Sequence, residues 1–459
     1  MGFREEVDSM GTVKVPEDAY YGAQTQRAIE NFPISGLTFQ PVFIKAIALI
    51  KKHAAHINQQ CGLLPLDVSM AIVQAAQEVM DGTFDDQFAV DVFQTGSGTS
   101  TNMNVNEVIA GRANEIITGN IGGKSPVHPN DHVNLGQSSN DVIPSAIHIS
   151  AFISIKNRLL PALQNLHESL KNKADEFKDI VKIGRTHLQD AVPVTLGQEF
   201  GGYARQVELA IERLQSIKPR LAELALGGTA VGTGMNTHPE FARRVIACIA
   251  QETGCPFVEA KNHFEAQAAQ DAAVETSAVL KTVAVSLTKI ANDIRWLASG
   301  PRCGIGEIVL PDLQPGSSIM PGKVNPVMPE VILQVAAQVV GNDAAITIGG
   351  QAGNFELNTM LPLIAYNLLQ SIEILASAVN VFTEKCVDGI IANKEKCAAT
   401  VDKSIALVTT LVPLIGYDKA AALAREAWET GTSVREIALK RNILAEEELN
   451  KLFEKVHEH

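Results

Sequence analysis

One stretch of the chain decides the fold: FEAQAAQDAAVETSAVLKTVAVSLTKIANDIRWLAS, residues 264–299. It contains no glycine or proline, and apolar or small side chains recur at alternating spacings of four and three. This heptad seam predicts a helix from about 264 to 299, which would be roughly 54 Å long and would need parallel neighbours. The seam consists of Ala269, Ala273, Thr276, Leu280, Val283, Leu287, Ile290, Ile294 and Leu297.

Four other segments have the pattern of long helices, and Pro144 and Pro161 allow a bend in the first of them. The segments are 141–178, 198–224, 327–348 and 363–388. Together with 264–299 they predict an all-α, mainly helical fold with a central elongated five-helix bundle. The seams carry more apolar surface than one bundle can bury, so we expect self-association.

The distribution of glycine, proline and asparagine divides the chain into three regions, which we take as domains. An N-terminal, mostly helical domain covers 1–137 and includes shorter helices near 41–60 and 67–80. The central bundle covers 138–389, and a small helical domain with alternating charges covers 390–459.

Composition excludes several classes of partner. The formal net charge of -13 argues against nucleic acid and anionic membranes, both of which require a basic surface. No apolar run approaches the ~20 residues that span a bilayer, and the N-terminus lacks the features of a signal peptide. The six cysteines contain no CxxC pair, which predicts reduced thiols in a cytosol-like compartment.

The segment GSSIMPGKVNP, residues 316–326, resembles a phosphate-binding loop only superficially. Five residues separate Gly316 from Gly322, whereas a Walker A loop has four, and Val324 stands where a metal-binding hydroxyl is required. The remaining serines, lysine and asparagine suit a carboxylate ligand or a developing negative charge.

A second polar stretch, QTGSGTSTNMNVNE at 94–107, lacks the third glycine and the preceding strand of a dinucleotide-binding loop. Its hydroxyl and amide side chains could bind a carboxylate, and a simple helix N-cap with a glycine turn remains the alternative.

A third stretch, HPNDHVNLGQSSND, covers 128–141. His128 and His132 are four residues apart, but Pro129 argues against a helical pair of metal ligands. Ser138, Ser139 and Asn140 predict a helix N-cap, and this helix N-terminus can also bind an anion.

The stretch GRTHLQDAVPVTLGQE, residues 184–199, places His187 in a polar loop before a helix. A histidine near a carboxylate can act as an acid or base at neutral pH, and Glu330 is a candidate partner. By contrast, His53 and His56, which lie among lysines on an amphipathic segment, predict a solvated face.

These motifs together resemble the fumarase/aspartase superfamily over essentially the whole chain. GSSIMPGKVNP, TGSGTS, HPND, SSND and GRTH stand in the superfamily's order, and LALGGTAVGTGMNT (224–237) is similar to class II fumarases. Aspartate ammonia-lyases typically have GRTQ and MPAK where this chain has GRTH and MPGK.

The resemblance implies three helical domains and a homotetramer in which four central bundles form one twenty-helix core. It implies active sites built from three stretches on three different subunits. The implied reaction is the reversible hydration of fumarate to L-malate, with proton abstraction at C3 and loss of the C2 hydroxyl through an aci-carboxylate. No metal or organic cofactor is expected, the partner is a small dicarboxylate, and the location is cytoplasmic or, for a mature form, the mitochondrial matrix.

The resemblance also assigns site residues. Ser317 becomes the base, with Lys323 and backbone N–H groups stabilising its alkoxide, and His187, oriented by Glu330, handles the proton on the departing water. The implied substrate-binding residues are Ser97, Gly98, Thr99, Ser138, Ser139, Asn140, Thr186, Ser318, Lys323, Val324 and Asn325. A second anion site is implied at His128, Pro129, Asn130 and Asp131.

Two positions depart from the superfamily pattern: His132 and Leu135 replace residues that are often acidic and basic, which bears on the second anion site. Two alternatives remain: a sibling lyase, such as an aspartate ammonia-lyase, and a structural protein on the same scaffold, as lens crystallins resemble argininosuccinate lyase. Intact Ser317, Lys323 and His187 favour an enzyme.

Overall fold

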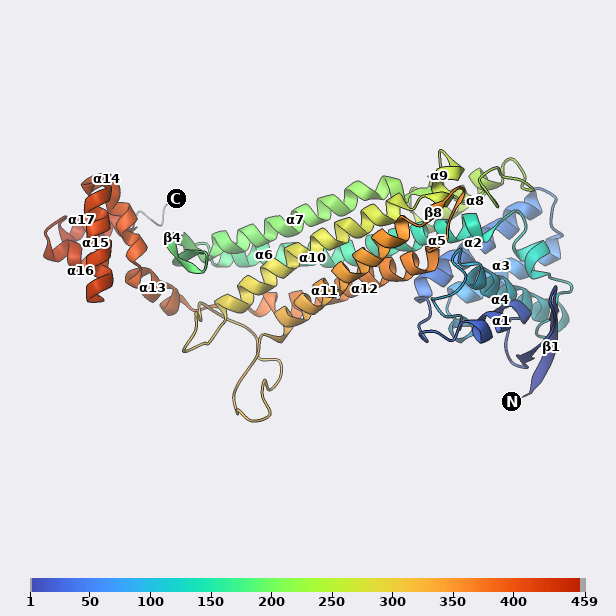
Figure 1. Cartoon of the computed structure of the whole chain (residues 1–459), viewed down its shortest axis with the longest axis horizontal. Helices are drawn as coiled ribbons and strands as arrows, with labels where there is room; N and C mark the ends of the chain where they lie inside the picture. The colour runs from blue at the N-terminus through green and yellow to red at the C-terminus, as the bar shows by residue number, and fades with distance from the viewer. Residues whose placement is uncertain (1, 455–459) are drawn as a thin grey trace. The chain divides into compact units, whose positions relative to one another are not determined.

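The computed structural model describes residues 2–454 and is mainly helical, which confirms the predicted fold class (Figure 1). The longer α-helices are α2 (Pro41–Gln60), α3 (Leu66–Met80), α4 (Thr99–Thr118), α5 (Ser139–Ser154), α6 (Leu160–Glu176), α7 (Leu196–Leu221), α8 (Phe241–Thr253), α10 (Asp271–Leu297), α11 (Val327–Gly350), α12 (Leu361–Lys385) and α15 (Tyr417–Thr430). The shorter α-helices are α1 (Ala23–Asn31), α9 (His263–Ala268), α13 (Lys394–Lys403), α14 (Val412–Ile415), α16 (Val434–Lys440) and α17 (Glu446–Glu454).

The strands are short and pair in twos. Antiparallel hairpins are formed by β1 (Phe3–Asp8) with β2 (Gly11–Pro16), β3 (Val181–Thr186) with β4 (Gln189–Thr195), and β8 (Gly353–Asn354) with β9 (Leu357–Asn358). Two further pairs are β5 (Glu223–Leu224) with β6 (Val258–Glu259), and β7 (Ile308–Val309) with β10 (Ile391–Ala392). Short segments of 3₁₀ or π geometry are η1 (Asp85–Gln87), η2 (Pro129–Val133), η3 (Ile155–Leu159), η4 (Val387–Gly389) and η5 (Ile405–Leu411).

Residue contacts divide the chain into two compact units. Unit 1 contains the residues up to Pro161, Glu212–Ala284 and Ala337–Ala376. Unit 2 contains Ala162–Ile211, Val285–Ala336 and the residues from Ser377 onward. The three domains predicted from the sequence stay a prediction.

In unit 1, α2 packs against α3 and α5, and its apolar side chains Phe43, Ile47 and Ile50 are fully buried. The segments of α10, α11 and α12 that belong to this unit lie side by side (yellow to orange in Figure 1) and are joined by hydrogen bonds. Ser277 donates to Asp343 at 2.8 Å, and Asn342 donates to Ser371 at 2.9 Å. Because these polar groups are buried, their pairing fixes the register of the helices.

In unit 2, aromatic rings join the residue that follows α6, Phe177, to α7. Phe177 and Phe200 meet edge to face with centroids 5.3 Å apart, and Phe200 meets Tyr203 at 5.5 Å. The Tyr203 hydroxyl donates to Asp293 of α10 at 2.9 Å. The C-terminal helices of this unit enclose a separate apolar cluster around Leu411, Leu423, Val434, Ile437 and Leu449.

The predicted helix over 264–299 is wrong at its start. Helix α9 ends at Ala268, Ala269 is extended with ψ of 142°, and α10 begins at Asp271. The side chain of Asn262 caps α9, and Asp271 places an acidic group in the first turn of α10. Local capping therefore divides the predicted helix into α9 and α10, although the heptad pattern runs through both.

The segment 141–178 is helical as predicted up to Glu176, but a π turn, η3, interrupts the α geometry between α5 and α6. The π turn ends two residues before Pro161, whose missing N–H removes an intrahelical hydrogen bond. Pro144 lies inside α5 without interrupting the helix.

The solvated face predicted around His53 and His56 is half wrong. His56 is exposed, but His53 is buried, and its Nε2 lies 2.9 Å from the Glu252 carboxylate. Burial lowers the pKa of His53, while Glu252 opposes that shift.

The expectation that no apolar run is long enough to span a bilayer is wrong by length and composition: two helical segments, Val327–Gly350 and Leu361–Gly389, are long and apolar enough to cross a membrane. Only 33% of the apolar window in α11 is buried within the chain, compared with 61% in the second segment. Helix α11 therefore presents an apolar face that the described chain does not cover.

We expect Phe200→Ala to lower the free energy of unfolding by about 3–5 kcal/mol, because it empties a fully buried site and removes two aromatic contacts. The matched control is Phe3→Ala on β1, where the ring is 64% exposed and its loss should change stability little. Urea denaturation followed by circular dichroism measures both, and equal denaturation midpoints would contradict the assignment of this core.

Candidate functional site

Two predicted polar stretches meet at the N-termini of α4 and α5 in unit 1. The Ser97 and Thr99 hydroxyl oxygens lie 2.7 Å apart, and Thr99 lies 2.7 Å from the Ser139 hydroxyl. Gly98, the N-cap of α4, has φ of 72°, a left-handed conformation that favours glycine. A row of hydroxyls across two helix N-termini can bind a carboxylate, because helix dipoles and free N–H groups both favour negative charge.

The buried carboxylate of Asp141 fixes this arrangement. Its Oδ1 accepts the Ser138 N–H at 2.9 Å, and its Oδ2 accepts the N–H groups of Gly227 and Thr229 at 3.0 Å each. Burial raises the pKa of Asp141 to about 6, although the three backbone hydrogen bonds lower it. One carboxylate thus caps α5 and anchors the 224–237 loop beside it.

Asn140 makes a second connection to that loop by donating from Nδ2 to the Ala230 carbonyl at 2.8 Å. The Ser138 hydroxyl accepts the Asn140 N–H at 3.2 Å, which completes the cap of α5. The N-cap predicted from SSND is confirmed, and the same residues leave a polar face at the helix end.

The HPND segment forms the π turn η2. Pro129 occupies its first position, where a missing N–H is harmless, so the proline does not prevent a helical turn here as the sequence suggested. The His128 Nδ1 accepts the N–H groups of Asn130 and Asp131 at 3.1 and 3.2 Å. Burial lowers the pKa of His128, and the Asp131 carboxylate opposes this.

In unit 2, the stretch predicted as a loop around His187 is a tight hairpin. Thr186 pairs with Gln189, so His187 and Leu188 form a two-residue turn with φ of 56° and 60°. Such turns normally contain Asn-Gly, since other side chains are strained at positive φ. His187 and Leu188 are both exposed at the tip.

An ion cluster under β3 supports this strained tip. Arg185 donates to both oxygens of Glu307 at 2.9 and 2.7 Å, and the buried Lys182 ammonium lies 3.3 Å from the same carboxylate. Lys182 also donates to Glu199 at 2.8 Å. The hydrogen bond to Glu307 raises the pKa of Arg185. Hydrogen-bonded, paired charges of this kind are costly to separate and therefore hold the hairpin in place.

The 316–326 loop is closed at its neck by backbone and amide hydrogen bonds. Gly316 N–H donates to the Lys323 carbonyl at 2.7 Å, and Asn325 Nδ2 donates to the Gly316 carbonyl at 2.8 Å. A Cβ at Gly316 would lie 2.6 Å from the Lys323 oxygen, so only glycine fits there. The closure brings the backbone of Lys323 beside the start of the loop, where Ser317 follows Gly316.

The Ser317 hydroxyl oxygen is the focus of this loop. It accepts the N–H groups of Ile319 at 3.2 Å and Met320 at 3.0 Å. Two donors on one oxygen stabilise negative charge on it, as an oxyanion hole does. Ser318, Lys323 and Val324 are exposed.

The other predicted residues of unit 2 lie on separate elements. Thr186 is exposed at the end of β3, and Glu330 stands in the first turn of α11. The pairing of His187 with Glu330 stays a prediction, as do all the site roles.

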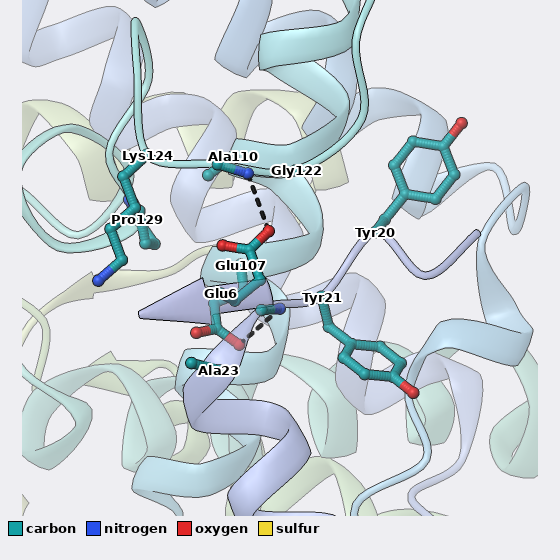
Figure 2. A pocket seen from close by; sticks show the side chains of 11 residues that line it. Glu6, Tyr20, Tyr21, Ala23, Glu107, Ala110, Gly122, Lys124 and Pro129 are labelled. Carbon is teal, nitrogen blue, oxygen red and sulfur yellow. Dashed lines mark hydrogen bonds between the residues drawn. The ribbon is translucent and has the colours of Figure 1, made fainter. Parts of the chain in front are cut away.

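Cavities near these residues are small. One cavity of about 10 Å³ lies beside Asn325, and another of about 10 Å³, which Pro129 helps to line, is shown in Figure 2. Each has room for about one water molecule, so neither accommodates a dicarboxylate.

In the second cavity the carboxylates of Glu6 and Glu107 are engaged with backbone (Figure 2). Glu107 accepts the N–H groups of Gly22, Gln24 and Thr25 at 2.9 to 3.0 Å and so caps α1 from α4. Burial raises the pKa of Glu107. The cavity is therefore explained as part of a structural cap.

Sequence reasoning missed Asp141 and Glu307 as supports of the site. A serine followed three residues later by an acid, Ser138 and Asp141, is the signature of a capping box and could have identified the first. No local signal marks Glu307, because its partner Arg185 lies 122 residues away.

The chain was compared with family models, with curated proteins and with solved structures. The Lyase family model matches residues 11–341, and the model of the fumarase C C-terminus matches 407–455. The chain is 55% identical to fumarate hydratase class II of Nitrosomonas europaea, covering 98% of this chain and 97% of that protein. It is 54% identical to mitochondrial fumarate hydratase of Homo sapiens, covering 98% of this chain and 88% of that protein.

A solved structure also matches nearly the whole chain. Class II fumarase from Schistosoma mansoni superposes with a TM-score of 0.95 at 42% identity, covering 98% of each chain. Since the family model covers most of the chain and these relatives match nearly all of it, the chain belongs to the class II fumarase family of lyases.

Proposed function

We propose that this chain catalyses the reversible hydration of fumarate to L-malate. The observation that carries the proposal is the pair of backbone N–H groups on the Ser317 oxygen. A serine is too weak a base for a carbon acid unless its alkoxide is stabilised, and these donors supply that stabilisation. The names of the relatives, fumarate hydratases at about 55% identity, support the same reaction.

In the proposed mechanism, Ser317 removes a proton from C3 of malate, and the electron pair moves into the neighbouring carboxylate to form the aci-carboxylate. Lys323 and Asn325 bind that developing charge. His187, oriented by Glu330, donates a proton to the C2 hydroxyl, which leaves as water while the double bond forms. The reverse sequence hydrates fumarate.

The unit 1 residues bind the substrate in this proposal. The hydroxyls of Ser97, Thr99 and Ser139 and the N-terminus of α5 hold a carboxylate, because they concentrate donors and positive dipole ends. Thr186 and Ser318 complete the contacts, and the π turn at His128–Asp131 serves as a second anion site.

We propose a homotetramer with active sites shared among three subunits. Three exposed features support association: the apolar face of α11, the strained tip at His187–Leu188, and the Ser317 loop with its exposed Ile319. Exposed apolar surface of this kind typically marks an interface. We also propose a cytoplasmic location or, for a mature form, the mitochondrial matrix, because the relatives include both a bacterial and a mitochondrial enzyme.

We expect the purified protein to convert L-malate to fumarate without added metal or organic cofactor, because general acid–base groups suffice for the reaction. Fumarate absorbance in the ultraviolet measures this, with L-aspartate as the parallel substrate. Turnover of aspartate alone would show that His187 and Gly322 are not markers for malate, and the chain would be an ammonia-lyase.

Ser317→Ala should lower kcat at least about 100-fold, because it removes the base from the reacting carbon. The matched control is Ser404→Ala, since the Ser404 hydroxyl also accepts an N–H two residues on, at 3.2 Å, but caps a helical turn in the C-terminal cluster. Initial rates with malate measure both variants. Near-normal turnover of a folded Ser317→Ala protein would reject the serine base.

Light scattering should give four times the 49.2 kDa mass of one chain, because we propose a homotetramer.

Ile348→Lys places a charge on the exposed apolar face of α11 and should reduce both the assembled fraction and the activity. Met10→Glu in the exposed β1–β2 turn is the control for added charge. A fully active monomer would refute the shared site.

A further inference from the structure

Helix α2 carries a lysine inside the protein. Lys51 is 0% exposed, and its ammonium donates to Asn134 Oδ1 and to Gln137 Oε1, each at 2.9 Å. Its neighbour Lys52 faces elsewhere, donating to Gln77 and Glu252 at 2.8 Å. A lysine placed among apolar residues of a helix would ordinarily be exposed.

This burial is unfavourable by itself. Removing an ammonium from water costs several kcal/mol, and two neutral amide oxygens repay only part of it. Burial lowers the pKa of Lys51 to about 7, and the carboxylate of Asp141 opposes that shift. A methionine at this position would fill a similar volume without the free-energy cost of desolvating a charge. We therefore expect the ammonium to have a role other than packing.

The two acceptors of Lys51 organise one turn of the chain. Asn134 Nδ2 donates to the Gln137 carbonyl at 3.1 Å, and Gln137 Nε2 donates to the carbonyls of Val133 and Leu135 at 3.1 and 3.2 Å. Because Lys51 binds the amide oxygens, it leaves the amide nitrogens free to bind these carbonyls.

Helix α4 meets the same point. Asn102 and Asn106 donate to Asn134 Oδ1 at 3.2 and 3.1 Å, so three donors from α2 and α4 converge on one oxygen. The oxygen of Asn134 thereby connects the helix that starts at Thr99 to the turn that ends at Ser138.

The turn lies between two candidate anion-binding segments. It begins at the π turn that follows His128 and ends at the N-cap Ser138 of α5. A displacement of the turn would therefore move both anion-binding segments relative to the hydroxyls of α4.

We propose that Lys51 is a positioning residue: its ammonium holds Asn134 and Gln137, and through them aligns the N-terminus of α5 with that of α4 to bind the substrate carboxylate. Lys51 does not touch substrate in this proposal, so its loss weakens binding more than it slows the chemical step. The kinetic test of this inference, the KM for L-malate, rests on the proposed function. Its structural test, hydrogen exchange, rests only on the hydrogen bonds that Lys51 makes with Asn134 and Gln137.

The test replaces Lys51 with methionine in the full-length protein. We expect Lys51→Met to raise KM for L-malate about tenfold while kcat changes less than about twofold, since only carboxylate binding is disturbed. Lys52→Met is the matched control, because it removes the adjacent lysine from the same helix but leaves the turn untouched. It should keep the KM of the parent protein.

A second variant covers the case in which Lys51→Met does not fold. Gln137→Met removes one of the two acceptors and should raise KM in the same direction. In the double variant the two effects should not add, because both act through one turn. An unchanged KM in folded Lys51→Met or in Gln137→Met, or a loss of kcat at constant KM, overturns the proposal.

Hydrogen exchange separates this inference from the proposed function. Amides in 128–142 should exchange faster in Lys51→Met than in Lys52→Met, whatever the substrate is. If the parent protein has no activity on malate but this exchange difference is present, the proposed function fails while the turn-holding role stands. Equal exchange in the two variants overturns the role of Lys51 even if the enzyme is a fumarase.

Discussion

Each of the two groups of candidate residues depends on one buried carboxylate. In unit 1, Asp141 receives three backbone N–H groups and so joins the cap of α5 to the 227–229 loop. In unit 2, Glu307 receives Arg185 in a two-pronged ion pair and supports the hairpin below His187. A buried carboxylate that loses its donors is strongly destabilised, so these partners cannot drift without cost. The rigidity of the polar groups follows from that constraint.

The two carboxylates support different kinds of geometry. Asp141 acts on the N-terminus of α5 and on a loop in which one non-glycine residue, Thr229, has a positive φ of 57°. Glu307 acts on a two-residue turn in which His187 and Leu188 both adopt positive φ. Strain of this kind persists only when neighbouring contacts over-determine the backbone, and it gathers at functional sites. Two consecutive residues in this strained conformation lower the stability of the hairpin, so we interpret its geometry as serving function.

Local signals were sufficient for most of the fold. The segment 41–60 became α2 with the same bounds, because Pro41 begins the helix and the apolar spacing continues to its end. The SSND cap was also local. The hairpin at His187 was missed, since His-Leu is a poor turn sequence and its support comes from Glu307, far along the chain. Lys51 was missed for the same reason: its partners lie 83 and 86 residues away, and only tertiary structure shows that it is buried.

Most of the proposed binding residues lie in unit 1 and the proposed proton-transfer residues lie in unit 2, and each role suits the elements that carry it. Binding a carboxylate requires fixed donors, and unit 1 supplies them from helix termini and a buried amide network. Proton transfer requires groups that reach the reacting carbon, and unit 2 carries these on an exposed hairpin tip and an exposed loop. Such loops would be poor sites in water, because charge on Ser317 is stabilised best where solvent is excluded. In the proposed tetramer, association would supply that exclusion, so the same apolar surface that assembles the subunits would also let the two N–H donors stabilise the Ser317 alkoxide more strongly.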